Sequence, residues 1–370
     1  MKQVLIAQEY VPNYRAPFFE ELVEQAARQG IHITVAANGP VGAQSQRGDA
    51  TNEGFVVVFQ REFSLFGRRI TIRNLNSLIR NADLVILEQA RRNIDIYRLL
   101  LPQRHQKIAL WGHGRDRTKT VGKFDKKLLA KLTRRSCWFF GYTQSSVEDV
   151  VAQGVPRART TLVLNSTDTG RLKRDLATVD SALQSEFRTR HGLNGRVALF
   201  LGALDESKRL DWLIAAGCEA ASADDQFRLV IAGDGALRGY VRDQELTHDW
   251  LLSVGPLSGV ELASWLAVAD VIPIPGRVGL VAVDSIASCT PIVAVNGALH
   301  GPEFDYLKHG ENCVLSENSL EAFISTFLSV LRDDDLRQKI TIGCELSSNL
   351  YSTEIMARNF LDGVKNALST

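Results

Sequence analysis

Short apolar runs of strand length alternate with amphipathic stretches along the whole chain, and this rhythm predicts alternating strands and helices. Runs in the first half predict strands at residues 3–8, 31–37, 54–59, 82–88, 107–111 and 137–142. Runs in the second half predict strands at residues 196–202, 227–233, 251–255, 270–274 and 291–295. Because strands joined through helices pair in parallel, the pattern predicts an α/β chain with two doubly wound parallel sheets.

A polar stretch at residues 165–180 lies between the two series of strands and predicts the seam between two domains. We expect an N-terminal domain at 1–168, a C-terminal domain at 172–350, and a last helix at 351–370 that packs back on the N-terminal domain. Doubly wound sheets bind ligands beyond the carboxyl ends of their strands. The expected active site is therefore a cleft between the two domains.

The composition of the 370 residues, 45% hydrophobic and 23% charged, is that of a globular protein. The N-terminal apolar run is too short for a signal peptide, and no stretch has the roughly 20 unbroken apolar residues of a membrane-spanning helix. The cysteines are scattered without a CxxC pair, which argues for a reducing compartment and against a zinc site. These features predict a cytoplasmic protein. The cysteines are Cys137, Cys218, Cys289, Cys313 and Cys344.

Charge is divided unevenly along the chain. Residues 1–170 hold 25 Lys and Arg against 15 Asp and Glu, a net charge of +10, whereas residues 171–370 hold 18 against 27, a net charge of −9. Such asymmetry indicates that the first half meets something anionic. Nucleic acid and an anionic membrane are both candidates, and charge alone does not choose between them.

Residues 115–135 are the most basic segment, with nine Lys and Arg against two Asp. As a helix, this segment would carry an apolar strip beside a cationic one, the arrangement of a peripheral membrane helix. The strips are formed by Phe124, Leu128 and Leu132 and by Lys123, Lys127 and Lys131. The alternative is a surface helix whose leucines face its own core and whose lysines are solvated. We expect docking on an anionic membrane through this segment, at the inner face of the membrane.

The stretch PIPGRVGLVAVDSIASCTPIVAV, residues 273–295, combines a crowded glycine loop with an apolar helix. Gly276 and Gly279 leave backbone amides uncovered where the helix begins, and the helix dipole favours an anion there. Arg277 adds a formal charge, and Asp284 places a carboxylate in the helix. The plain alternative is an ordinary strand-to-helix turn. The stretch predicts a phosphate site with an acid that receives the adjoining sugar.

Neighbouring motifs strengthen this interpretation. FLGALDESKRLDWLI at 200–214 places a lysine and an arginine at the start of a helix, and LVIAGDG at 229–235 ends a strand in a glycine turn. With the loop at 273–295 and EFDYLKHGENCVL after it, residues 196–315 resemble the nucleotide-binding domain of the GT-B glycosyltransferases of family 4. The GTP-type turn of that family corresponds to Cys289, Thr290 and Pro291. The first half resembles the family more loosely.

The resemblance implies two Rossmann-like domains facing a central cleft and a retaining, metal-independent transferase. Its donor is a UDP- or GDP-linked sugar, its acceptor is a glycan or a lipid-linked molecule, and no cofactor or nucleic acid takes part. Surface polysaccharide or glycolipid synthesis in a bacterium is the expected setting. Catalytic roles fall on His113, Lys208 and Asp284. Donor contacts fall on Arg209, Gly233, Gly235, Gly276, Arg277, Gly279, Leu280 and Asp284.

The expected acceptor residues lie in the first half. YVPNYRAPFFEEL at 10–22 is similar to the loop that follows the first strand in this family, and that loop lies over the acceptor and the donor phosphates. WGHGRD follows a predicted strand, so a histidine is placed at the carboxyl edge of the sheet. Asn165 resembles the asparagine at the interdomain hinge, although a simple turn residue is the alternative. The acceptor residues implied are Asn13, Tyr14, Arg15 and His113.

Two positions depart from the family pattern. The family carries two glutamates across the loop and helix, and the matching positions are Gly276 and Asp284. Asp284 still accepts hydrogen bonds from ribose hydroxyls, but Gly276 offers no carboxylate. The arginine that often precedes the lysine is Ala203 here, and Arg209, Arg277 or Arg15 would have to compensate.

No metal constellation or GxSxG motif occurs, and the acidic run Asp333, Asp334 and Asp335 fits the start of a surface helix. Two rival functions stay open. A non-hydrolysing sugar-nucleotide epimerase shares the two-sheet architecture, and a non-catalytic GT-B partner protein would keep the fold while binding a glycan or nucleotide.

Overall fold

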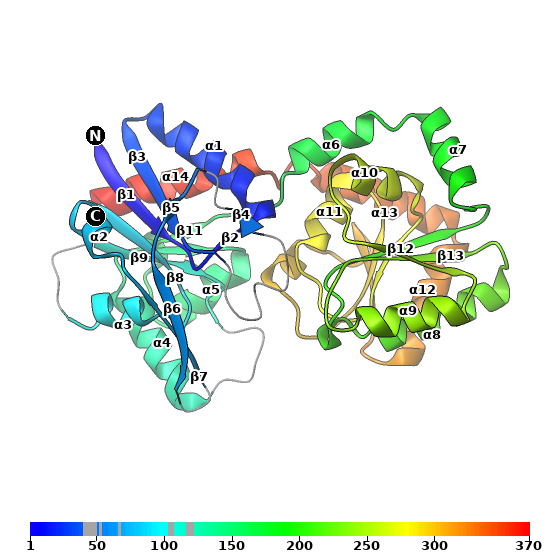
Figure 1. Ribbon diagram of the computed structural model, residues 1–370, viewed down its shortest axis with the longest axis horizontal. Helices are drawn as coiled ribbons and strands as arrows, with labels where there is room; N and C mark the ends of the chain where they lie inside the picture. Colours follow the sequence, from blue (N-terminus) through cyan, green and yellow to red (C-terminus); the bar gives the residue numbers. More distant parts are fainter. Residues whose placement is uncertain (40–49, 52–53, 66–67, 103–106, 116–121) are drawn as a thin grey trace. The chain divides into compact units, whose positions relative to one another are not determined.

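The computed structural model describes residues 1–39, 50–51, 54–65, 68–102, 107–115 and 122–370. The chain divides into two compact units, which Figure 1 shows. Unit 1 comprises Met1–Thr167 with Thr353–Thr370, and unit 2 comprises Asp168–Ser352. Among the helices of the described residues, none is long and apolar enough to cross a membrane.

Unit 1 is built on a parallel sheet with the strand order β11-β10-β9-β8-β1-β3-β5 (Figure 1). The chain starts in the middle, winds outward through β3, and then crosses to β8 and winds outward the other way. The switch point, where such a sheet leaves a crevice, therefore lies between the carboxyl ends of β1 and β8. The strands are β1 (Lys2–Ala7), β3 (Ile31–Ala37), β5 (Val56–Val57), β8 (Leu84–Glu88), β9 (Lys107–Gly112), β10 (Phe139–Gly141) and β11 (Thr160–Leu162).

The two faces of this sheet carry separate cores because successive strand residues point to opposite sides. Val4 and Ile6 of β1 pack with one pair of helices, and Leu5 packs with the helices of the other face. Burial on both faces explains the continuous apolar runs in the sequence. The first pair is α1 (Ala16–Ala27) and α14 (Thr353–Ser369), and the second layer is α2 (Asn76–Arg80), α3 (Ile94–Leu100), α4 (Lys123–Arg135) and α5 (Gln144–Ala152).

The last helix, α14, belongs to unit 1 although it follows unit 2 in the chain. The ring of Phe360 stacks on Phe140 with a centroid distance of 4.4 Å. A side chain at Gly363 would lie 2.4 Å from Oγ1 of Thr161, so only glycine allows the helix this close to the sheet. The C-terminus therefore completes the core of the N-terminal sheet.

A hairpin of β6 (Gln60–Leu65) and β7 (Arg68–Arg73) adds to unit 1, and the apolar pattern does not predict it. Gln60 and Arg73 are cross-strand partners on one face, and both are buried. Phe63 and Ile72 lie on the other face and are 39% and 38% exposed. The hairpin thus turns its polar face inward and its apolar face outward, the reverse of the usual pattern. A short ladder joins β2 (Val11–Pro12) to β4 (Ala50–Thr51).

The two leucines of the apolar strip predicted within residues 115–135 face the core of unit 1, so the expectation that they meet a membrane is wrong. Leu132 is fully buried and Leu128 packs beside it, both in the core of unit 1. The helix amphipathicity therefore serves the unit's own core. Lys127 and Lys131 are exposed, as expected. Residues 116–121 and the side chains of positions 123 and 124 lie outside the described residues.

Unit 2 contains two parallel sheets, β12-β13-β14 and β15-β16-β17, joined by a parallel bridge between Ala198 and Val271. The chain again winds outward in one direction before it crosses to the other side. The switch point of unit 2 therefore lies between the carboxyl ends of β12 and β15. The strands are β12 (Val197–Leu201), β13 (Arg228–Ala232), β14 (Leu251–Gly255), β15 (Ile272–Ile274), β16 (Ile292–Val295) and β17 (Cys313–Ser316).

Side-chain caps mark where several helices of unit 2 begin. Asp168, Ser319 and Asp333 each accept a hydrogen bond from the amide three residues on. The acidic run at 333–335 is therefore a helix start, as the sequence predicts. The helices are α6 (Thr169–Ala177), α7 (Ser181–Arg190), α8 (Leu210–Ala223), α9 (Arg238–Thr247), α10 (Gly259–Val268), α11 (Val281–Ser288), α12 (Leu320–Arg332) and α13 (Asp334–Ser347).

Candidate functional site

Loops that follow β12 and β13 meet at the carboxyl edge of unit 2. A Cβ at Gly233 would lie 1.8 Å from the carbonyl oxygen of Gly202, and a Cβ at Gly235 would lie 2.5 Å from that of Leu204. No side chain fits at such distances. The glycines of the GDG turn therefore let two loop backbones touch, and this is a structural role beside the donor role predicted for them.

The loop after β15 packs equally closely against the segment that carries Lys208. A Cβ at Gly276 would lie 2.3 Å from the carbonyl oxygen of Ser207 and 2.5 Å from the carbonyl carbon of Lys208. The amide of Arg277 donates to the Ser207 carbonyl at 2.8 Å. This backbone leaves no room for the family's glutamate at position 276.

Lys208 ends the short helix η4 (Glu206–Lys208) and is buried, with 9% of the residue exposed. Its Nζ donates to the carbonyl oxygen of Arg277 at 2.6 Å. The pKa of Lys208 is lowered to about 8, mainly by burial and also by the nearby Arg277, against the opposite effect of Asp205. No ion pair joins Lys208 or Arg277 to a carboxylate in the described residues. The two cations therefore lie near each other without a close ion pair, although the charge of Asp205 acts on Lys208.

The N-terminus of α11 lies in the same loop. Its N-cap residue, Leu280, makes no side-chain capping bond, and a Cβ at Gly279 would meet nothing within 4 Å. In the described residues the amides of Gly279, Leu280 and Val281 donate no hydrogen bond, and the helix dipole favours an anion at such a helix start. Asp284 is half-buried in the first turn of the helix. Amides, Lys208 and Arg277 together form a candidate phosphate site.

Arg209 follows Lys208 in the left-handed region, with φ of 52°. Its Nη1 donates to Oδ1 of Asn318 at 2.7 Å, and its guanidinium lies 4.4 Å from the ring centroid of Trp212. A non-glycine residue in this conformation is uncommon and tends to occur at functional sites. Arg209 is thus held beside the loop by neutral partners, and its donor role remains a prediction.

His300 is a residue of this site that the sequence does not point out. It follows β16, and its Nδ1 accepts a hydrogen bond from the amide of Val278 at 3.1 Å. The next amide, of Gly301, donates to the Val278 carbonyl at 2.7 Å. The sequence feature that could have pointed to His300 is the pair His300 and Gly301 after a predicted strand, at the carboxyl edge where such sheets bind ligands.

Three of the acceptor residues predicted in unit 1 are exposed. Asn13 and Tyr14 lie on the short helix η1 (Asn13–Arg15), which follows β2. His113 directly follows β9, and its ring centroid lies 4.6 Å from that of Tyr142. The carboxyl edge of the sheet thus presents these side chains, as the sequence indicated for His113.

Arg15 differs from the prediction because it is buried. It donates to Oδ1 of Asn165 at 2.5 Å, and its guanidinium carbon lies 5.3 to 5.8 Å from the ring centroids of Tyr14, Phe18, Trp111 and Tyr142. Cation–π contacts of this kind stabilise a desolvated arginine. These contacts hold Arg15 within unit 1, and its roles toward the acceptor and the diphosphate stay predictions.

The switch point of unit 1 holds an ion-pair network. Oε2 of Glu9 accepts from Arg69 at 2.8 Å, and its other oxygen accepts from Arg92. Glu88, at the end of β8, accepts from the amide of Glu9 at 2.9 Å. The pKa of Glu88 is raised to about 7, mainly by burial and also by the negative charge of the nearby Glu9.

Arg73 of the hairpin completes this network. Its Nε donates to Asp95 at 2.9 Å, and its Nη1 lies 3.8 Å from Glu88, with the Arg73 and Asp95 side chains fully buried. Buried charges persist only when they are paired in this way. The polar inner face of the hairpin therefore fills the switch point of unit 1 with opposite charges.

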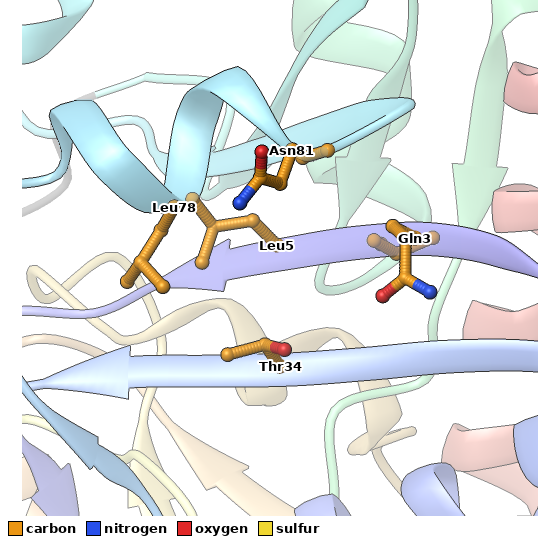
Figure 2. A pocket seen from close by; sticks show the side chains of 7 residues that line it. Gln3, Leu5, Thr34, Leu78 and Asn81 are labelled. Atoms are coloured by element: carbon orange, nitrogen blue, oxygen red, sulfur yellow. The ribbon is translucent and has the colours of Figure 1, made fainter.

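A shallow pocket of about 180 Å³ lies elsewhere in unit 1, and Figure 2 shows it between β1, β3 and α2. Gln3, Leu5 and Thr34 come from the strands, and Leu78 and Asn81 line the other side. It lies toward the amino ends of β1 and β8 and has no titratable side chain. It therefore offers no catalytic chemistry. In the described residues, no group of His, Cys, Asp and Glu could hold a metal ion.

The family match to known proteins lies in unit 2. Residues 195–333 match the model of the family described as glycosyl transferases group 1. This match covers the loops of unit 2 described above. The D-inositol 3-phosphate glycosyltransferase of Pseudarthrobacter chlorophenolicus is 30% identical to the chain over 174 residues, which are 43% of this chain and 40% of that protein. The matched region thus spans about two-fifths of that relative.

Solved structures resemble the chain over nearly its full length. Anabaena HepE in complex with UDP matches with a TM-score of 0.71 and 16% identity, covering 99% of this chain and 100% of HepE. A putative UDP-N-acetylglucosamine 2-epimerase from Listeria monocytogenes matches with a TM-score of 0.64 and 14% identity, covering 100% of this chain and 97% of that one. At these identities the likeness shows the fold: the chain has the GT-B fold, an α/β fold with parallel sheets in two regions.

Proposed function

We propose that the chain is a glycosyltransferase that moves a sugar from a nucleotide-diphosphate sugar to a glycan or lipid-linked acceptor, with retention of configuration. One observation carries this proposal: Lys208 and Arg277 lie together without a carboxylate partner beside the open amides at the start of α11. Such a group of donors is suited to a diphosphate. The group 1 family model covers this site, which supports the donor class.

In the reaction, the bond between the anomeric carbon and the diphosphate oxygen breaks, and its electron pair leaves with the diphosphate. Lys208, Arg277 and the amides before α11 stabilise the charge that develops there. Asp284 accepts hydrogen bonds from the ribose hydroxyls. The acceptor hydroxyl forms the new bond to the anomeric carbon and passes its proton to the departing diphosphate oxygen, while His113 orients the acceptor or the sugar.

The donor nucleotide is proposed to be UDP-linked, with GDP as the second choice. HepE, which shares the fold, was crystallised with UDP and with UDP-glucose. A thermal-shift panel of nucleoside diphosphates and their sugars tests this choice, because a ligand that binds only the folded state raises the melting temperature. No shift with any UDP- or GDP-linked compound would contradict the proposal.

No metal ion is proposed to take part, because protein cations already face the diphosphate. Sugar transfer should therefore continue in excess EDTA. Activity that disappears on chelation and returns with magnesium or manganese would show that the diphosphate charge is balanced by a metal.

The alternative enzyme is a non-hydrolysing epimerase, and the Listeria structure shows that the fold accommodates proteins with that name. The matched sequence relative is named a glycosyltransferase, which favours transfer. The two functions separate in one assay. A transferase releases nucleotide only when an acceptor is present, whereas an epimerase interconverts two nucleotide sugars without one. A non-catalytic partner would bind the nucleotide and do neither.

We also propose that unit 1 docks on an anionic membrane, which places the protein at the inner face of a cytoplasmic membrane. Surface polysaccharide or glycolipid synthesis is the proposed setting. The leucines of α4 are in the core, so its contribution is electrostatic, through exposed residues such as Lys127 and Lys131. The exposed apolar face at Phe63 and Ile72 would supply the insertion.

Co-sedimentation with vesicles tests this docking. The wild type should pellet with vesicles that contain anionic lipid at low salt and be released by salt, since each surface charge contributes about 1 kcal/mol. Changing Lys127 and Lys131 to Glu should weaken pelleting, and changing Phe63 and Ile72 to Ser should weaken it independently of salt. Equal pelleting of all three proteins would refute the membrane proposal.

A further inference from the structure

His300 ties the loop before α11 to strand β16. Its Nδ1 accepts from the amide of Val278 at 3.1 Å, and its Nε2 lies 2.7 Å from the carbonyl oxygen of Val295. An N–H that points at Nδ1 and a carbonyl that faces Nε2 require the neutral ring with its proton on Nε2. A single buried ring thus bridges two backbone segments at the carboxyl edge of unit 2.

Further contacts fix the ring and the loop. Phe304 stacks on His300 with a centroid distance of 3.8 Å and an interplanar angle of 2°. The amide of Gly301 donates to the carbonyl of Val278 at 2.7 Å. Val278 is therefore held at both its N–H and its C=O, directly between the cation Arg277 and the open amide of Gly279.

The charges around the ring keep it neutral. The pKa of His300 is lowered to about 4, mainly by burial and also by the cations Arg209, Lys208 and Arg277, against the effect of the hydrogen bond to Val295. From the following helix, η5 (Pro302–Tyr306), the buried Glu303 comes within 2.9 Å of a Cβ placed at Gly301. A neutral ring can accept the amide bond of Val278, which an imidazolium ion cannot.

We propose that His300 is the positioning residue of the donor loop. It holds residues 276–279 in the conformation in which Arg277 and the amides before α11 face the diphosphate. This role rests on the proposed function of the site, because the loop is taken to receive the donor. His300 does not touch the reacting atoms in this account and acts through Val278.

The test separates the ring's shape from its hydrogen bonds. His300→Phe keeps a flat ring against Phe304 and loses both bonds. His300→Asn keeps an acceptor near the position of Nδ1 and loses the bond to Val295. The matched control is His309→Phe, because Nδ1 of His309 also accepts a backbone amide bond, from Leu315 at 2.9 Å, in a different turn.

Two readouts are made at pH 7.5 on each full-length protein. Hydrogen exchange, followed by mass spectrometry, reports the protection of a peptide spanning 273–283 without ligand. Calorimetry reports the affinity for UDP. His300→Phe should exchange this peptide faster and bind UDP about 10- to 100-fold more weakly, as expected when a buried amide loses its partner. His300→Asn should stay within roughly threefold of the wild type, and His309→Phe should match it.

The outcomes distinguish this role from the proposed function. Unchanged exchange at 273–283 in His300→Phe would overturn the positioning role whatever the affinity is. Faster exchange with unchanged UDP affinity would overturn it as well, because the loop would then not serve the donor. If the wild type bound no nucleotide, the proposed function would fail, and the exchange readout would still decide whether His300 holds the loop.

Discussion

In unit 1 the crevice between β1 and β8 holds arginines that face carboxylates, whereas in unit 2 the crevice between β12 and β15 holds cations that face backbone. Arg73 meets Asp95 and Glu88 in the first crevice. Lys208 meets the carbonyl of Arg277 in the second. Both lie at the switch point of a doubly wound sheet, where ligands bind. Arg73 in unit 1 is paired with carboxylates, whereas Lys208 and Arg277 in unit 2 form no close ion pair in the described residues.

The pKa shifts at the two crevices follow from this difference. Burial raises the pKa of Glu88 to about 7 and lowers that of Lys208 to about 8. Both shifts mean that burial disfavours the charged form of the side chain. A diphosphate beside Lys208 would raise its pKa again, because an adjacent anion favours the charged ammonium. The comparison teaches that the same position in the fold serves as a structural brace in one unit and as a candidate donor site in the other.

The largest expected effect is on the stability of unit 1. Arg73→Met would remove the hydrogen-bonded partner of the buried Asp95 and leave it only Arg98, 3.8 Å away, so the free energy of unfolding should fall by about 3–5 kcal/mol. Denaturant unfolding measures this, with Arg28→Met as a control, since the exposed pair of Arg28 with Glu24 contributes less than about 1 kcal/mol. UDP binding in the folded variant should be unchanged. Equal stability of the two variants would contradict the brace.

A smaller effect is expected when the loop of unit 2 is crowded. Gly276→Ala would push the loop away from Ser207 and Lys208, at a cost of about 1–3 kcal/mol, and should weaken UDP binding. Gly276→Glu restores the family's carboxylate and should bind no better. Gly239→Ala is the control, because a Cβ there meets nothing within 4 Å. Calorimetry that finds tighter binding in Gly276→Glu would contradict the close packing seen here.

The smallest effect concerns pH and the carboxylate of Glu88. Its pKa is raised in the folded state, so its contribution to stability is full below about pH 4.5 and is lost as the pH rises through about 7. Glu88→Gln should remove this dependence, which we expect to reach about 1 kcal/mol once partial exposure is allowed for. Unfolding curves at pH 5 and pH 8 measure it. If the wild type became more stable relative to Glu88→Gln as the pH rose from 5 to 8, the raised pKa of Glu88 would be contradicted.

Much of the fold could be predicted because buried parallel strands are continuous apolar runs. β1, β3, β12 and β13 are examples that agree with the predicted residues to within one or two positions. The hairpin β6–β7 was missed because its polar residues face inward, toward the ion-pair network, so its pattern does not mark a buried strand. β11 and β17 were also missed, although β10 and β15, which are no longer than these, were predicted.

The candidate site was predictable only in part. The glycine loop and Lys208 stand out because their residue types and order are visible in the sequence. The burial of Arg15 was not predictable, since its aromatic surroundings come together only in the folded unit. His300 carried no signal of periodicity, and its importance comes from hydrogen bonds to two backbone segments 17 residues apart, at Val278 and Val295.

The central claim is that Lys208 is kept buried and charged for a diphosphate, and one substitution tests it most directly. Lys208→Met removes the desolvated ammonium and keeps the aliphatic stem. Calorimetry with UDP and thermal unfolding are measured on the same two proteins. The account predicts that the variant loses about 2 kcal/mol of UDP binding while its melting temperature is equal or higher. Equal UDP affinity in both proteins, or a variant that is strongly destabilised, would contradict the account.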